Sequence, residues 1–160
     1  MNKINNLYIR IIFALAVVLL IVMLWVRVNK NEHRIDTLYD VLDTDVSGIS
    51  LEKRAWARIQ GWRSENNLDQ YIYDRSLCDV ANARLGEIKS DWSHKGFAKY
   101  IYSVDFKYLG ENLAKGFDDS YQMFEAWLKS PTHRNNLIKY THSCLVCSDG
   151  YCVQIFGSYR

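Results

Sequence analysis

Three short polar stretches of the sequence combine the side chains that metal binding and acid–base chemistry require. They are Ser93-His94-Lys95-Gly96, Gly110-Glu111-Asn112 and Ser130-Pro131-Thr132-His133-Arg134. We expect them at helix ends and turns, where polar side chains commonly face a cleft. Two neutral imidazoles, from His94 and His133, can bind a divalent ion such as zinc. Glu111 can then be a third ligand, orient a ligand, or act as the catalytic base toward a bound water.

The same residues also allow a purely structural interpretation. His94 then ends a helix, His133 lies in the first turn of another, and Glu111 or Asn112 hydrogen-bonds the loop backbone between them. Each residue taken singly favours this interpretation. A serine or cysteine nucleophile finds no support, because Ser93 merely adjoins His94 and the side chains of neighbours diverge.

Amphipathic helices are expected to position these stretches. Two apolar stripes at helical spacing predict two helices, and Ser50 can cap the first of them. The two stripes are Leu51, Ala55, Ile59 and Trp62, then Leu77, Val80, Ala81, Arg84, Leu85 and Ile88. A third helix is predicted from about 119 to 129, with its inward side chains at Tyr121, Phe124 and Leu128. It ends before Pro131, because the residue before a proline leaves helical geometry, and a short helix begins again at Ser130-Pro131.

The C-terminal part of the chain predicts a β-hairpin. Two runs of β-forming residues, 140–147 and 151–157, flank Asp149-Gly150, a dipeptide that favours a type I′ turn. If the turn has two residues, Cys147 and Cys152 face each other, and Cys144 pairs with Cys78 or stays free. A zinc knuckle of Cys144, Cys147 and Cys152 with His142 is the alternative, and disulfides are favoured over it.

The N-terminal part predicts a membrane anchor. Residues 11–26 carry no polar side chain, and Arg10 and Arg27 bracket them. The length suits a single transmembrane helix at 1–28 that is not cleaved, because no small-residue cleavage site follows it. A linker or short helix at 29–48 then leads to one domain at 49–160. The even number of cysteines favours an extracytoplasmic domain, although the count of flanking positive charges does not.

Composition limits the classes of function. The chain has 160 residues and a formal net charge of +2, from 20 basic and 18 acidic residues scattered along it. Nucleic acid is not an expected partner, because a one-sided basic surface is missing from this distribution. Nucleotide chemistry is not expected either, since the glycines form no phosphate-binding motif.

Taken together and in order, these motifs resemble those of the CAP superfamily, which includes cysteine-rich secretory proteins, antigen 5 and plant pathogenesis-related proteins. The resemblance is greatest to its short bacterial branch and covers about 51–157. The matching motifs are the helix with Leu77 and Ala81, Ser93-His94, Gly110-Glu111-Asn112-Leu113-Ala114, Trp127-Leu128-Lys129-Ser130-Pro131-Thr132-His133-Arg134-Asn135-Asn136, and Tyr151-Cys152-Val153-Gln154-Ile155-Phe156-Gly157.

The resemblance implies an α+β fold, an α-β-α sandwich, whose cleft holds two histidines and acidic residues and in some members binds a divalent metal. His94, Glu111 and His133 match those positions. The resemblance also implies a structural role for Asn112, whose amide would tie loops together. We expect structural roles for Trp127, in the core, and for Ser130 and Pro131 as well. A second acidic residue is expected three residues after Trp127, but the chain has Ser130 there and Glu125 before the tryptophan.

The family has no single shared reaction, and function does not follow from fold. We expect a membrane-anchored, extracytoplasmic binding module that takes a metal or a polar or lipid ligand in the cleft of His94, Glu111 and His133. Membrane, lipid, sterol or an envelope protein are the expected partners. The alternatives are a metal-assisted hydrolase with Glu111 as base, and a structural envelope protein without a ligand.

Overall fold

The computed structural model describes residues 17–26 and 49–159 of the chain. Residues 17–26 are α-helical. Within the described residues, no helix combines the length and the apolar character needed to cross a bilayer. Most of the predicted anchor at 1–28 and the whole predicted linker at 29–48 lie outside the described residues. The compact unit that carries the candidate site runs from Gly48 to Arg160.

The described residues of this unit, 49–159, form four α-helices, one 3-10 helix and four strands. In chain order they are α2 (Leu51–Glu65), β1 (Ile72–Tyr73), α3 (Arg75–Ile88), η1 (Lys95–Tyr100), β2 (Tyr108–Lys115), α4 (Ser120–Lys129), α5 (Pro131–Lys139), β3 (His142–Ser148) and β4 (Tyr151–Ser158).

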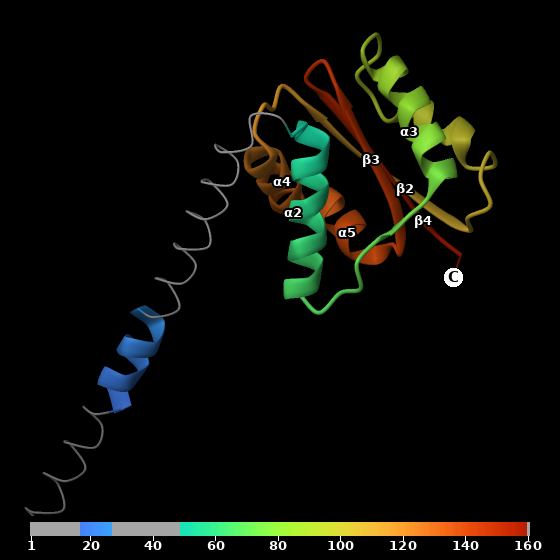
Figure 1. Ribbon diagram of the computed structural model, residues 1–160. Helices are drawn as coiled ribbons and strands as arrows, with labels where there is room; N and C mark the ends of the chain where they lie inside the picture. Colours follow the sequence, from blue (N-terminus) through green and yellow to red (C-terminus); the bar gives the residue numbers. More distant parts are fainter. Residues whose placement is uncertain (1–16, 27–48, 160) are drawn as a thin grey trace, which may run out of the picture. The chain divides into compact units, whose positions relative to one another are not determined.

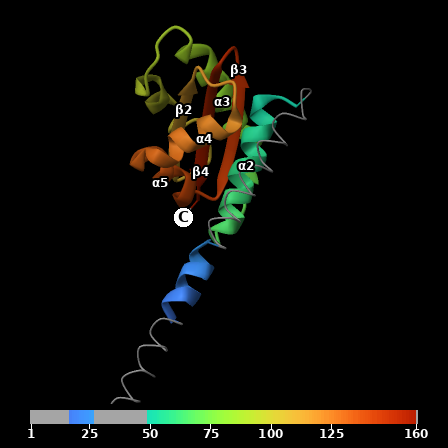
Figure 2. The same ribbon diagram turned by 90° about the vertical axis from the view of Figure 1, so that its left-hand side faces the viewer.

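The four strands form one sheet in the order β1-β3-β4-β2. β1 runs parallel to β3, while β4 pairs antiparallel with both β3 and β2. Helix α3 covers one face of the sheet, and α2, α4 and α5 lie on the other (Figure 1, Figure 2). The predicted α-β-α sandwich is therefore confirmed.

The helix boundaries follow from capping residues. The Ser50 side chain accepts a hydrogen bond from the backbone N–H of Lys53 at 3.4 Å, and α2 begins there as predicted. Asp119 caps α4 by accepting from the N–H groups of Tyr121 and Gln122. Ser130 has extended geometry, with ψ of 116°, so α4 ends before Pro131 and α5 begins at it. The predicted restart is confirmed.

The predicted hairpin is also confirmed. Asp149 and Gly150 both have positive φ, 53° and 74°, as a type I′ turn requires. The turn sets Cys147 opposite Cys152, and the two form a disulfide. Cys78 and Cys144 form a second disulfide that ties α3 to β3. All four cysteines are therefore consumed, and the zinc-knuckle alternative is wrong.

Each face of the sheet has its own hydrophobic core. Trp127 and Phe156 lie in the core under α2, α4 and α5. Leu77 and Ile155 lie in the core under α3. Because side chains alternate across a strand, Phe156 and Ile155 of β4 serve opposite cores. The two cores hold the helices against the sheet and so fix the positions of the elements that carry the site residues.

The free edge of β2 is closed by side chains. Tyr140 donates its hydroxyl to the carbonyl of Leu109 at 2.6 Å, and Asn136 donates its amide to the carbonyl of Glu111 at 3.2 Å. Trp127 Nε1 donates to the next outward carbonyl, that of Leu113, at 3.0 Å. These bonds satisfy backbone groups that an edge strand would otherwise leave unpaired.

Candidate functional site

The structure brings the three predicted cleft residues together from separate elements. His94 lies in the turn before η1, Glu111 in the middle of β2, and His133 in the first turn of α5. His94 Nδ1 lies 2.8 Å from Glu111 Oε1. The ring centroids of His94 and His133 are 6.2 Å apart.

The expectation that Glu111 and Asn112 lie at a turn or helix end is wrong. Both are paired residues of β2, opposite Ile155 and Gln154 of β4. Glycine, glutamate and asparagine are poor strand formers, so the residue types at 110–112 do not predict a strand. The strand conformation determines the geometry of the site. Because successive side chains of a strand point to opposite faces of the sheet, Glu111 points toward α3 and Asn112 toward the other face.

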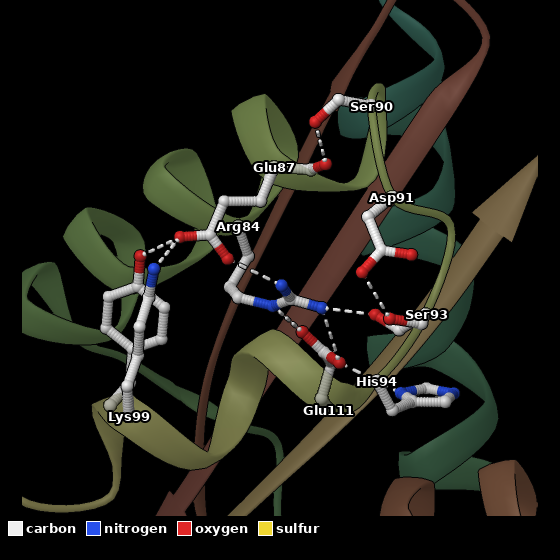
Figure 3. A network of polar contacts seen from close by, with 9 residues as sticks. Arg84, Glu87, Ser90, Asp91, Ser93, His94, Lys99 and Glu111 are labelled. Atoms are coloured by element: carbon white, nitrogen blue, oxygen red, sulfur yellow. Dashed lines mark hydrogen bonds and ion pairs between the residues drawn. The ribbon is translucent and has the colours of Figure 1, made fainter.

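Arg84 of α3 is the residue of this site to which sequence reasoning assigned no role. Its side chain is only 1% exposed, as is that of Glu111. Arg84 Nε donates to Glu111 Oε2 at 2.6 Å, and Nη2 lies 3.3 Å from Glu111 Oε1 (Figure 3). The sequence did contain a signal for this role. Arg84 lies on the apolar stripe of a predicted helix, and a charged side chain that is buried requires a partner of opposite charge.

The opposite side of the Arg84 guanidinium faces Glu87. Arg84 Nη1 donates to Glu87 Oε2 at 2.6 Å, and Glu87 Oε1 accepts from Tyr100 at 2.6 Å and from Lys99 (Figure 3). Desolvation raises the pKa of Glu87, but the bonds from Lys99, Tyr100 and Arg84 prevail and lower it from 4.5 to about 2. Glu87 is therefore a carboxylate at neutral pH.

A chain of amides holds the backbone of His133 against β2. Asn112 is fully buried and donates its side-chain amide to the carbonyl of His133 at 3.1 Å. Asn136 in turn donates to Asn112 Oδ1 at 2.9 Å. The backbone of His133 is thus tied directly to the strand that carries Glu111.

His133 is suited to act as a neutral ligand. Burial lowers the pKa of its imidazole, and the nearby charge of His94 lowers this pKa further. A neutral imidazole keeps a lone pair for a metal or a hydrogen-bond donor. His133 is held in that form at neutral pH.

The remaining site predictions fall outside this cluster. Glu125 forms an ion pair with Lys129 at 3.7 Å along α4. Ser130 lies at the N-cap of α5, where its side chain makes no capping hydrogen bond. Across residues 17–26 and 49–159, no three or more His, Cys, Asp or Glu side chains form a group that can hold a metal ion.

A three-layer α-β-α fold that brings two histidines together beside a strand-borne glutamate defines the class of protein. The model of the cysteine-rich secretory protein family, CAP, matches residues 56–156. The chain belongs to this family, as the resemblance predicted.

Solved structures agree with this assignment. An extracellular protein with an SCP domain from Bacillus anthracis is 25% identical, with a TM-score of 0.60; the alignment covers 68% of this chain and 40% of that one. A cysteine-rich secretory protein from Staphylococcus aureus is 19% identical, with a TM-score of 0.62 and coverages of 68% and 38%. The chain therefore spans about two fifths of each of these proteins.

An outer surface protein from Borrelia burgdorferi is similar over most of its own length. It is 24% identical with a TM-score of 0.57, and the alignment covers 68% of this chain and 92% of that one. The Staphylococcus and Borrelia structures support the fold alone at these identities. No curated protein sequence matches this chain.

Proposed function

We propose that this protein is a non-catalytic binding module whose cleft takes a divalent metal ion, or a polar ligand group, between His94 and His133. One observation carries the proposal: both oxygens of Glu111 are already engaged. Arg84 binds Oε2 at 2.6 Å and His94 binds Oε1 at 2.8 Å. The two imidazoles are left as the groups of the cleft that a ligand can contact.

The donor set fits a metal ion of intermediate softness such as zinc. His94 and His133 would hold it, with Glu111 behind His94 as the group that orients the imidazole. A bound divalent cation would supply positive charge and Lewis acidity for a carboxylate, phosphate or carbonyl group. The chain's own residues provide the two nitrogens and their orientation.

The metal-assisted hydrolase is the weaker reading. Catalytic zinc sites use three protein ligands, and the described residues offer no third ligand beside the two histidines. A general base must also have an oxygen free to reach the water it activates. Glu111 is held by Arg84 and His94 instead, so it suits a role in orientation.

We propose an extracytoplasmic location next to a membrane. The apolar run at 11–26 between Arg10 and Arg27 supports a single-pass anchor. Two disulfides support an oxidising compartment. The Bacillus anthracis relative, which is described as an extracellular protein, supports the same location. Lipid, sterol and envelope proteins are the ligand and partner classes to screen.

Isothermal titration of zinc into the purified, oxidised protein tests the cleft. We expect one zinc per chain, and loss of that binding in the His94→Ala, His133→Ala double variant. His142→Ala is the matched control, because the His142 imidazole packs against Phe106 and Tyr159 instead. Zinc binding that survives in the double variant would refute the metal proposal, and a wild-type protein without zinc binding would leave the polar or lipid ligand to be sought.

A further inference from the structure

We propose that Arg84 is the positioning residue of the cleft: it fixes Glu111 so that His94 is held with its proton on Nδ1 and its lone pair on Nε2. The inference deepens the proposed function, on which it rests, because Nδ1 of His94 is engaged by Glu111 and the ring can then bind a ligand only through a lone pair on Nε2. Arg84 would act through Glu111 and the Ser93 carbonyl, which it binds directly, and would not itself be a ligand of the metal.

The first step is the orientation of the carboxylate. Arg84 Nε and Nη2 approach the two oxygens of Glu111 at 2.6 and 3.3 Å, the paired geometry that guanidinium and carboxylate favour. Both side chains are 1% exposed, so water does not compete for these bonds. Glu111 is therefore held in one rotation, with Oε1 directed at His94.

The second step is the tautomer of His94. An ionised carboxylate only accepts hydrogen bonds, so the 2.8 Å contact between Glu111 Oε1 and His94 Nδ1 requires the proton on Nδ1. In a neutral ring the other nitrogen, Nε2, then carries the lone pair. The His94 side chain is 58% exposed, and this bond together with the ring contact to His133 restrains it.

The third step is that Arg84 holds His94 from its backbone as well. Arg84 Nη2 donates to the carbonyl of Ser93, the residue before His94, at 2.7 Å (Figure 3). The Arg84 guanidinium thus fixes the position of the Glu111 carboxylate, which accepts from the imidazole, and of the backbone at the start of the turn that carries His94. A purely structural ion pair would stabilise the fold without governing the tautomer, and the two roles can be separated by experiment.

The tautomer can be read directly from imidazole nitrogen shifts of the full-length chain, labelled with 15N-histidine in detergent at a pH where the ring is neutral. In the wild-type protein we expect His94 as a single Nδ1–H tautomer. A wild-type His94 with its proton on Nε2 would overturn the proposal without any variant.

Glu111→Gln is the sharpest variant because it keeps the shape of the side chain. Gln has one oxygen, and Arg84, which only donates, requires it. The amide NH2 must then face His94 and donate to Nδ1, so the His94 proton is expected to move to Nε2. A Glu111→Gln protein that keeps the Nδ1–H tautomer would contradict the control by Arg84.

Arg84→Gln removes the guanidinium and should give a mixture of both tautomers, because Glu111 is no longer held. Arg63→Gln is the matched control: Arg63 is also a buried arginine, 3% exposed, but it binds the carbonyls of Leu137 and Tyr140. It should lose stability and leave the His94 tautomer unchanged. An Arg84→Gln protein that is folded and keeps the single wild-type tautomer would refute the proposal.

Zinc affinity provides a second, independent test of the role of Arg84. If both proposals hold, Arg84→Gln should weaken zinc binding by about 10- to 100-fold, the usual effect of losing a group that orients a metal ligand. Wild-type protein that binds no zinc but shows the Nδ1–H tautomer, and its reversal in Glu111→Gln, would refute the metal site and keep the role of Arg84. Unchanged affinity in folded Arg84→Gln would refute that role.

Discussion

The indole Nε1–H of Trp127 donates a hydrogen bond to the carbonyl oxygen of Leu113, 14 residues earlier in the chain, at 3.0 Å. Through this bond helix α4 closes the free edge of the strand that carries Glu111. Asn136 and Tyr140 do the same for the two preceding outward carbonyls. The strand that carries Glu111 therefore has its outward backbone carbonyls hydrogen-bonded by side chains of α4, α5 and the residue that follows α5.

Trp127→Phe should destabilise the domain by about 1–3 kcal/mol, because the buried carbonyl of Leu113 loses its donor while most of the apolar contact remains. The free energy of unfolding in urea measures this loss. Trp92→Phe is the control, since Trp92 is 46% exposed. Equal losses in the two variants would show that the indole bond contributes nothing beyond packing.

Gly96→Ala should lower stability by about 1–3 kcal/mol, because an added methyl group overpacks a filled site. A Cβ at this position would meet Arg84 Nη1, and would lie 2.7 Å from Glu87 Oε2. Gly86→Ala is the control: apart from its chain neighbours and the adjacent backbone of α3, no atom lies within 4 Å of an added Cβ, and we expect a gain of about 0.5–1 kcal/mol within α3. Thermal unfolding of both variants measures these changes in stability. An unchanged stability of Gly96→Ala would mean that the ion pairs of Arg84 can shift at little cost in free energy.

The ion pairs of Glu87 should make stability depend on pH in acid. Because the folded-state pKa is about 2 against an ordinary value of 4.5, the folded state binds fewer protons than the unfolded state between these values. The contribution of Glu87 is thus complete above pH 4.5 and is lost as the pH falls toward 2. Urea unfolding at several pH values measures it.

Glu87→Gln should flatten this part of the pH profile. Glu125→Gln is the matched control, because its side chain is 30% exposed, against 29% for Glu87, and it meets Lys129 at the longer distance of 3.7 Å. The same acid dependence in wild type and Glu87→Gln would show that other carboxylates are responsible.

The two disulfides should differ in what they contribute. The sequence separations are 66 residues for Cys78–Cys144 and 5 for Cys147–Cys152, for which chain entropy gives about 4 and about 2 kcal/mol. We expect Cys78→Ala, Cys144→Ala to lower the free energy of unfolding more than Cys147→Ala, Cys152→Ala does. The reverse order would indicate that the hairpin disulfide has a role that loop closure does not describe.

Local signals in the sequence were sufficient for several elements of the fold. Ser50, Asp149-Gly150 and Pro131 each act on neighbouring residues, and the first helix, the hairpin and the break before α5 were predicted from them. The turn also set Cys147 opposite Cys152, because strand register follows from turn length. These features depend on backbone geometry within a few residues, which the sequence expresses directly.

The environment of Glu111 was decided only by the tertiary structure. Its strand was concealed by poor strand formers, and its partner Arg84 lies 27 residues earlier, on a helix across the sheet face. The sequence by itself named the family and the residues His94, Glu111 and His133. Which donor each oxygen of Glu111 meets depends on how two layers pack, since an ion pair forms through space and leaves no spacing along the chain to mark it.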